Sequence, residues 1–333
     1  MPNSILQRIG DTSLLELRRI VPQDCARIFV KLESENPTGS MKDRMALAMI
    51  EAAEASGRLR PGGRVVDYTG GSTGVSLALV CAARGYRLSL VTAAAFSAEK
   101  RAHMAALGAE VSLVPSTDGG MDEGLTRRMI AAAGEIATRR NACWTDQLNN
   151  ADQLPAYHRM AEEIWTQSNG GISAFVQATG TAASLRGIAE GLRRHKPDVL
   201  IVAVEPAESA VLSGGPSGVH RIEGIGAGFV VPLWKADLVD EIACVSTDEA
   251  MAMARRLALS EALFAGTSTG ANLVAAIAVG RRLGPEARIV TVACDSGIKY
   301  LSTALYAEES RVYSKPRVGG SAKDEALHYQ TDN

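Results

Sequence analysis

A lysine that closely follows a Pro-Thr-Gly-Ser turn is the first feature of the sequence that could carry chemistry. Lys42 stands in the stretch E-N-P-T-G-S-M-K-D-R at 35–44, after a strand-like segment at 27–33 and before an Ala- and Met-rich segment with helical spacing at 45–55. A lysine at such a junction is either a solvated residue of the first helical turn or a reactive amine held in a cleft. The motif alone leaves both interpretations open.

Three glycine-rich turns could each bind an anion. They read Y-T-G-G-S-T-G at 68–74, A-T-G-T-A-A-S at 178–184 and A-G-T-S-T-G-A at 265–271, and a helix is expected after each. Backbone N–H groups at a helix N-terminus bind carboxylate or phosphate. One such turn would mean little, but three favour a ligand with several anionic groups. None is a P-loop, and G-I-G-A-G-F at 224–229 lacks the final glycine of a dinucleotide fingerprint.

Two of these turns also fit the G-x-S-x-G nucleophile elbow of serine hydrolases, with Ser72 or Ser268 as the nucleophile. That fold needs an acid and then a histidine after the serine in the chain. Only His328 follows Ser268, in a polar segment, and an elbow as early as Ser72 would be unusual. A serine hydrolase is therefore a remote alternative.

Alternating strands and helices must position these turns. The alternation predicts an α/β fold with parallel-rich sheets covered by helices on both faces, whose ligands bind beyond the carboxyl ends of the strands. A Gly-, Ser- and Pro-rich segment at 206–236 is expected to be a long functional or mobile loop. The expected strands are 27–33, 64–68, 87–92, 110–115, 173–178, 199–205 and 287–293, and the expected helices include 45–55, 73–84, 97–107 and 121–140, with two more that end near 195 and 283.

Composition argues against several classes of partner. The 333 residues are 46% hydrophobic and carry a net charge of −2 without a basic stripe, so we expect no nucleic acid partner. No apolar run suits a membrane span and the first residues lack the core of a signal peptide, so we expect a cytoplasmic protein. The five scattered cysteines form no C-x-x-C motif and predict neither a disulfide framework nor a metal site. Cys81 and Cys294 are expected to be small buried apolar residues.

Taken together, the motifs resemble the cysteine synthase and cystathionine β-synthase family of pyridoxal-phosphate (PLP) enzymes, of the tryptophan-synthase-β-like fold type II. The resemblance covers about residues 5–305. It implies two domains with parallel-rich twisted sheets: a large cofactor-binding domain of residues 1–40 plus 147–310 and a smaller mobile domain of residues 41–146. Residues 311–333 would form a polar C-terminal tail, and a homodimer is implied. The matching segments are I-G-D-T-S-L-L-E-L (9–17), K-L-E-S-E-N-P-T-G-S-M-K-D-R (31–44), H-R-I-E-G-I-G-A-G-F (220–229) and D-S-G-I-K-Y-L-S-T (295–303).

The resemblance assigns a role to Lys42 and to each turn. Lys42 would carry PLP as an imine and, once the substrate displaces it, remove the α-proton as general base. Burial and the positive imine would lower the pKa of the free amine. Ser268 would face the pyridine nitrogen and Ser72 would lie at the ring oxygen. The cofactor phosphate would contact Gly180, Thr181, Ala182, Ala183 and Ser184, and the substrate would contact Thr69, Gly70, Gly71, Ser72, Thr73, Gln147 and Gly224.

The sequence departs from the family pattern at three places. Ser72 replaces an asparagine and is shorter, so it makes one fewer contact. Ala182 and Ala183 replace glycines, and alanine disfavours the positive φ angles that glycine adopts. Tyr157 and His158 appear in reversed order. These changes concern the choice of substrate more than the choice of cofactor.

The implied activity is β-replacement in a cysteine synthase-like transferase. An O-activated serine-type amino acid would lose its β-substituent to give an aminoacrylate, to which sulfide, a thiol or another nucleophile adds. The alternative is a PLP lyase that releases ammonia or sulfide, such as a serine/threonine dehydratase or a cysteine desulfhydrase, and a third class is a non-catalytic scaffold. Arg221 is either surface charge or a reader of an acidic group on the substrate. His103 and His158 are interpreted as ordinary helix residues.

Overall fold

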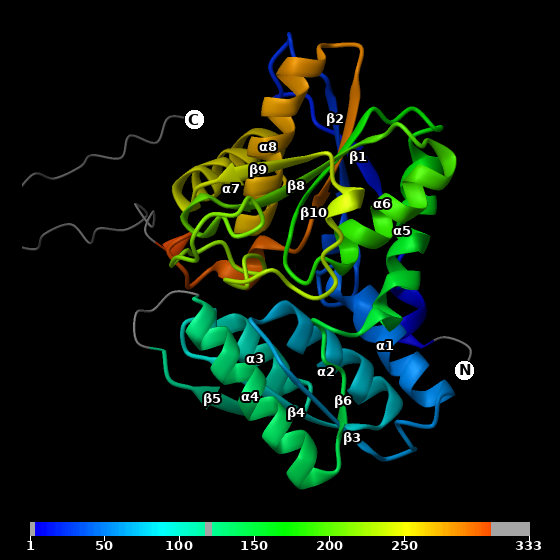
Figure 1. The fold of residues 1–333 in the computed structure, drawn as a ribbon, viewed down its shortest axis with the longest axis vertical. Helices are drawn as coiled ribbons and strands as arrows, with labels where there is room; N and C mark the ends of the chain where they lie inside the picture. The colour runs from blue at the N-terminus through cyan, green and yellow to red at the C-terminus, as the bar shows by residue number, and fades with distance from the viewer. Residues whose placement is uncertain (1–3, 117–121, 308–333) are drawn as a thin grey trace, which may run out of the picture.

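The chain forms two β-sheets with helices packed on them, which confirms the predicted α/β class (Figure 1). The computed structural model describes residues 4–116 and 122–307, and the structural statements below concern these residues. The predicted tail at 311–333 lies outside them.

The larger sheet has six strands in the order β1-β2-β10-β7-β8-β9. Every neighbouring pair is parallel except β1–β2. The central strands are runs of β-branched and small residues that are buried on both faces, as expected for a parallel sheet under helices. In Figure 1 the pair α5 and α6 lies on one side of this sheet and the pair α7 and α8 on the other. The elements are β1 (Leu14–Glu16), β2 (Arg27–Leu32), β7 (Ala174–Ala178), β8 (Leu200–Pro206), β9 (Glu241–Val245), β10 (Arg288–Ala293), α5 (Leu154–Gln167), α6 (Ala183–His195), α7 (Thr247–Glu261) and α8 (Thr267–Leu283).

The smaller sheet has four parallel strands in the order β5-β4-β3-β6. Helix α4 packs on β3 and β4, and α1 packs on α2, which lies next to the sheet. The predicted helix 121–140 is confirmed from Glu123 onward, and residue 121 is outside the described part. The elements are β3 (Arg64–Tyr68), β4 (Arg87–Ala93), β5 (Glu110–Val114), β6 (Cys143–Trp144), α1 (Lys42–Ala55), α2 (Ser72–Arg84), α3 (Ala98–Ala106) and α4 (Glu123–Arg140).

The chain passes between the two sheets close to the predicted domain limits. It leaves the larger sheet after Leu32 and returns after Trp144. The exact limits at 40 and 147 and the mobility of the smaller part stay predictions. Between β8 and β9, the described chain contains only short 3-10 turns, as the composition of 206–236 suggested. None of the described helices combines the length and apolarity that a membrane crossing requires.

Candidate active site

The turn before Lys42 is fastened to the end of the central strand β10. The Met41 N–H donates to the Cys294 carbonyl at 2.9 Å, and the Ser296 N–H donates to the Gly39 carbonyl at 2.9 Å. Gly39 has a φ of +69°, a conformation that glycine adopts without strain. Lys42 is then the first residue of α1. The sheet itself therefore places this amine at the carboxyl ends of the strands.

A buried ionic network holds α1 in this position. The Arg44 guanidinium lies 2.7 Å from Glu33 and 2.6 Å from Glu163, and Lys31 Nζ lies 2.7 Å from Glu163. These charges come from β2, α1, α5 and the short turn after β2. Burial acts to raise the pKa of Glu163, but hydrogen bonds and charge from Arg44 and Lys31 prevail and lower it to about 2.

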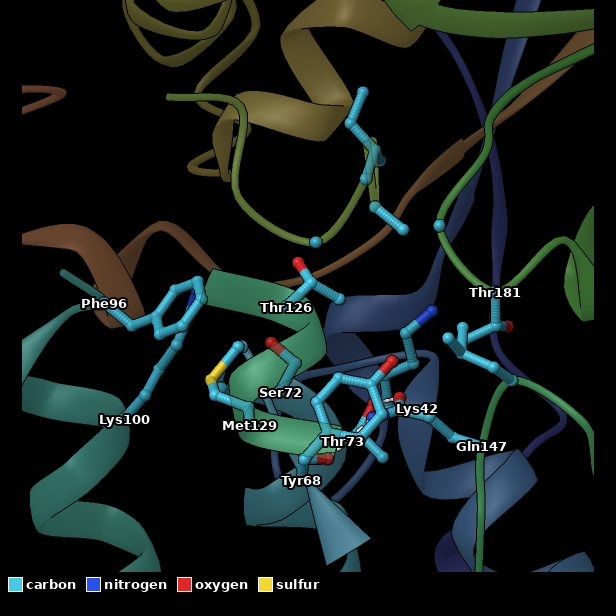
Figure 2. A pocket seen from close by; sticks show the side chains of 17 residues that line it. Lys42, Tyr68, Ser72, Thr73, Phe96, Lys100, Thr126, Met129, Gln147 and Thr181 are labelled. Atoms are coloured by element: carbon cyan, nitrogen blue, oxygen red, sulfur yellow. Dashed lines mark hydrogen bonds between the residues drawn. The ribbon is translucent and has the colours of Figure 1, made fainter. Parts of the chain in front are cut away.

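Lys42 projects into a cavity between the two sheets, which we call the active-site cavity (Figure 2). Its side chain stays partly exposed to this cavity, but protein atoms surround it closely. Burial lowers the pKa of the Lys42 amine, while Cys294 and Asp295 act in the opposite direction. The amine is thus partly unprotonated at lower pH than a solvated lysine. The lining residues are Lys42, Tyr68, Gly70, Gly71, Ser72, Thr73, Phe96, Lys100, Thr126, Met129, Gln147, Leu148, Gly180, Thr181, Gly224, Ile225 and Ala227.

A second, deeper cavity continues below Lys42 and brings Ser268 to the same place. Lys42, Ser72, Gly180 and Gly224 line both cavities, and Ser268 and Cys294 line the deeper one. The expectation that Cys294 is merely a small buried apolar residue is therefore wrong, because its half-buried thiol faces this cavity. Burial raises the pKa of that thiol to about 11, so it stays protonated.

The side chains of Thr69 and Thr73 fix the conformation and position of the turn at residues 69–73. Thr69 Oγ1 accepts hydrogen bonds from the N–H groups of Gly71 and Gly74, both at 2.9 Å. Thr69 is buried and does not line either cavity, so its side chain shapes the turn instead of facing a ligand. Thr73 donates to Gln147 Oε1 at 2.8 Å, which joins the turn to the segment after β6.

Asp67 fixes that segment to the end of β3. Its carboxylate accepts hydrogen bonds from Thr145 Oγ1 at 2.6 Å, from Trp144 Nε1 at 3.3 Å and from the Gln147 N–H at 3.3 Å. Complete burial raises the pKa of Asp67 to about 7, although these hydrogen bonds act to lower it. Gln147 is thereby set beside the turn, as predicted.

The segment at 180–184, which we call the phosphate loop, leads into the N-terminus of α6. The N–H groups of Thr181, Ala182, Ala183 and Ser184 donate to no acceptor among the described residues, so they are free for an anion. Gly180 passes so close to Gly224 that a Cβ on it would lie 2.3 Å from the Gly224 carbonyl oxygen.

Ala182 corrects the expectation about alanine in this loop. It adopts a φ of +65° and begins α6 in the left-handed region, the conformation that we expected alanine to avoid. Ser184 accepts a hydrogen bond from Gln177 Nε2 at 2.9 Å, and neither Ser184 nor the alanines line the two cavities. Contact from these three residues would therefore be made by their backbone.

Ser72 has a hydrogen-bond partner that the sequence did not predict. Ser72 Oγ donates to Asp295 Oδ2 at 2.9 Å, and Tyr300 donates to the same oxygen at 2.8 Å. The other oxygen of Asp295 is buried without a partner among the described residues. Asp295 lay inside a quoted motif, but nothing in that motif indicated that it would meet Ser72.

Lys100 and Glu223 are two more residues that were not predicted. Lys100, on α3, is 2% exposed, lies 2.7 Å from Glu223 and stands over the Tyr300 ring. Its stem crosses Gly71, where a Cβ would lie 2.3 Å from Lys100 Cδ. No local pattern could have found this pair, since its members are 123 positions apart.

Neither serine of the G-x-S-x-G turns has a histidine partner within residues 4–116 and 122–307, and His328 lies outside them. Ser72 bonds to Asp295, and Ser268 lies beside the Cys294 thiol. Among the described histidines, His158 pairs with Glu190 and His220 with backbone groups. The described part of the chain therefore contains no hydrolase triad. Arg221 lies in another cavity, separate from that of Lys42.

A desolvated lysine between a free helix N-terminus and a polar turn is the arrangement that suits an aldehyde cofactor carrying a phosphate. The chain belongs to the pyridoxal-phosphate dependent enzyme family, whose model matches residues 5–295. PLP is thus its cofactor, and the family resemblance is confirmed.

The chain is also similar to several individual enzymes and solved structures. A cysteine synthase of Staphylococcus aureus is 39% identical over 307 residues, which are 91% of this chain and 97% of the relative. An O-acetyl serine sulfhydrylase isoform from Entamoeba histolytica has a TM-score of 0.84 and 37% identity, covering 92% of both chains. A variant of O-ureido-L-serine synthase bound to O-ureido-L-serine has a TM-score of 0.87 and 33% identity over 95% of this chain and 96% of the other. A hydrogen sulfide-producing enzyme from Fusobacterium nucleatum has a TM-score of 0.85 and 33% identity over 90% of this chain and 100% of the other.

Proposed function

We propose that this enzyme catalyses β-replacement on an O-activated serine-type amino acid and adds sulfide, a thiol or a similar small nucleophile. One observation carries the proposal: Lys42 presents a desolvated amine to a cavity that lies between the free N–H groups of α6 and the turn at 69–73. Such a site can hold a phosphate on one side of the amine and a carboxylate on the other.

The residues of the site fit PLP. The phosphate loop would hold the phosphate through the backbone N–H groups of residues 181–184, and Gly180 would let the chain approach it closely. Ser268 in the deeper cavity would face the ring nitrogen, and a hydroxyl need not keep that nitrogen protonated. When bound, PLP supplies an electron sink for negative charge at the substrate α-carbon.

The protein groups supply binding and proton transfer. The N–H groups of the turn at 69–73 would bind the substrate carboxylate, with Gln147 beside them. Lys42 would accept the α-proton on Nζ, because its lowered pKa leaves the amine free to act as a base. Ser72, fixed by its hydrogen bond to Asp295, would contact the cofactor ring.

The apolar part of the active-site cavity favours a sulfur nucleophile over water. Tyr68, Phe96, Met129 and Ala227 supply apolar surface to its lining. Sulfide or a thiol loses less hydration than water or hydroxide on entering such a site, because sulfur is a weak hydrogen-bonding group. A lyase that releases sulfide or ammonia is the second candidate, since one structural relative produces hydrogen sulfide.

The test is product analysis with the PLP-loaded enzyme. O-acetyl-L-serine, O-phospho-L-serine and L-serine are each supplied with sulfide, and cysteine, pyruvate and ammonia are quantified. We expect cysteine from at least one O-activated donor and none with Lys42→Ala. Pyruvate and ammonia in place of a replacement product, with sulfide present, would refute β-replacement and favour the lyase.

The assembly and location belong to the same proposal. We propose a cytoplasmic homodimer in which residues 41–146 close over the substrate. Light scattering is expected to give twice the chain mass of 35.1 kDa. A mass of one chain at micromolar concentration would contradict the dimer.

A further inference from the structure

A separate cavity lies beside the active site, and we call it the side cavity. It is open to solvent, has a volume of about 390 Å³ and is walled on one side by residues 94–98 and 101. The opposite wall comes from the larger half, with His220, Arg221, Glu223, Met251 and Tyr300 among its members. Phe96 also lines the active-site cavity, so the two spaces share a partition.

Two arginines from opposite halves of the molecule face this space. Arg101 donates from NH1 to the carbonyl groups of Ala94 and Phe96, which fixes its guanidinium along the wall. Arg221 comes from the other half; its backbone N–H is held by Thr247 Oγ1 at 3.1 Å, and its exposed side chain is part of the cavity lining. Neither guanidinium pairs with a carboxylate among the residues that the structure describes.

The remaining polar groups of the side cavity are already satisfied. Glu223 is neutralised by Lys100 at 2.7 Å. His220 donates from Nε2 to the Gly226 carbonyl at 2.9 Å and accepts from the Ile222 N–H on Nδ1, so both ring nitrogens are used. Among the charged residues that line the cavity, Arg101 and Arg221 are thus the two without an ion-pair partner in the described structure, and a neighbouring acid, Glu99, is bonded to Ser302.

Part of the remaining wall is apolar, beside the hydroxyl residues Ser97, Thr267, Ser302 and Thr303. Ala94, Ala95, Phe96, Met251 and Tyr300 supply carbon surface next to the two guanidinium groups. A bare inorganic ion would leave that surface uncovered. A guanidinium group forms paired hydrogen bonds with a carboxylate, and an attached alkyl chain would cover the apolar wall.

We infer that the side cavity binds a small organic carboxylate, held between Arg101 and Arg221, as a site distinct from the catalytic one. Such a ligand would join the two halves, because one arginine comes from each. It would also act on catalysis, since Arg221 and Glu223 belong to the segment 220–229 that carries Gly224 and Ile225 into the active-site cavity. If the bound carboxylate changes the affinity for the amino-acid donor by some factor, the donor changes the affinity for the carboxylate by the same factor.

Binding is tested on the PLP-loaded enzyme, in which the phosphate loop is filled. Calorimetric titration with acetate, propanoate, butanoate and inorganic sulfate is compared for wild type, Arg101→Gln, Arg221→Gln and the control Arg60→Gln, an exposed arginine outside the cavity. We expect affinity to rise from acetate to butanoate and to fall about tenfold or more in each cavity variant. Sulfate is expected to bind more weakly than butanoate. The Arg60→Gln variant should match wild type.

Three results would overturn the inference. Wild-type affinity for butanoate in both cavity variants would place the bound carboxylate elsewhere, for example on the turn at 69–73. Absence of binding in wild type at millimolar butanoate would remove the site. Butanoate that binds through both arginines yet leaves the KM of the amino-acid donor unchanged would remove the coupling. The calorimetric arm does not depend on turnover, so it stays decisive if the proposed reaction is wrong.

Discussion

Burial determines the chemistry of the single side chains around the cleft. Lys100 and Lys299 are buried and Lys42 is half-buried, yet of these three only Lys100 has an acidic partner at bonding distance. Lys299 Nζ has no hydrogen-bond partner in the described structure, and burial lowers its pKa to about 8, against the opposing influence of Asp295. Of these three lysines, Lys42 is the one that lines the active-site cavity without an acidic partner at bonding distance.

Lys299 gives a stability prediction with a defined pH window. The unfolded chain holds this proton up to about pH 10.5 and the native chain only up to about 8, so wild-type stability rises with pH between these values. Lys299→Met should lack this rise and be more stable than wild type below pH 8, by roughly 3 kcal/mol. Urea denaturation of both proteins below pH 8 and above pH 10.5 measures this difference in stability. A constant difference across the window would contradict the assignment, and Lys196→Met, on an exposed pair, is the control.

Ala182 gives a prediction about backbone strain. A non-glycine residue at a φ of +65° is strained, so Ala182→Gly should raise the free energy of unfolding of the cofactor-free protein by about 0.5–1 kcal/mol. Ala183→Gly, one position later and inside α6, should lower it by up to about 1 kcal/mol. Denaturant titration of the two variants decides the matter, and a loss of stability in both would show that Ala182 is not strained.

Among the elements, α1 matters most, because it carries Lys42. Glu163→Gln breaks the buried network that ties α1 to β2 and α5, so the free energy of unfolding should fall by about 3 kcal/mol above pH 4.5. The folded pKa is lowered to about 2, so wild type loses this contribution as pH falls from 4.5 toward 2, and the two proteins should converge there. Glu286→Gln, at an exposed position, is the control. A pH-independent difference would mean that packing and not charge holds α1.

The sequence could predict the elements that repeat a strong pattern. Several strands were predictable because they are apolar runs between turn residues. They are β3, β4, β5, β7, β8 and β10. β6 has two residues and β1 three, too few for a pattern, and β9 is a partly exposed edge strand. Lys42, Ser268 and the glycine turns were singled out by residue type and position, and the family resemblance assigned their roles. The contacts Ser72–Asp295 and Lys100–Glu223 depend on how the two sheets meet, which no local pattern records.

At the scale of the whole molecule, those two contacts cross from one half to the other. Ser72 and Lys100 belong to the smaller half, and Asp295 and Glu223 to the larger. Figure 1 shows the halves above and below the region where these segments meet. These contacts tie the two halves together.

Removal of the ammonium group of Lys100 should loosen this junction. Lys100→Met keeps the stem that packs on Gly71 but leaves Glu223 unpaired, so amide hydrogen exchange should become faster in α3 and in the segment 220–226. Exchange in α5 and α6 should not change, and Lys196→Met should resemble wild type throughout. Unchanged exchange at α3 would mean that the ion pair does not join the halves.

The most direct measurement is the identity of the residue that carries the cofactor. The PLP-loaded protein is reduced with borohydride, digested and mapped by mass spectrometry. We predict a pyridoxyl adduct on Lys42 alone, and no visible imine absorption in Lys42→Ala. An adduct on Lys100, the other lysine that lines the active-site cavity, or an imine band that persists in Lys42→Ala would contradict the assignment.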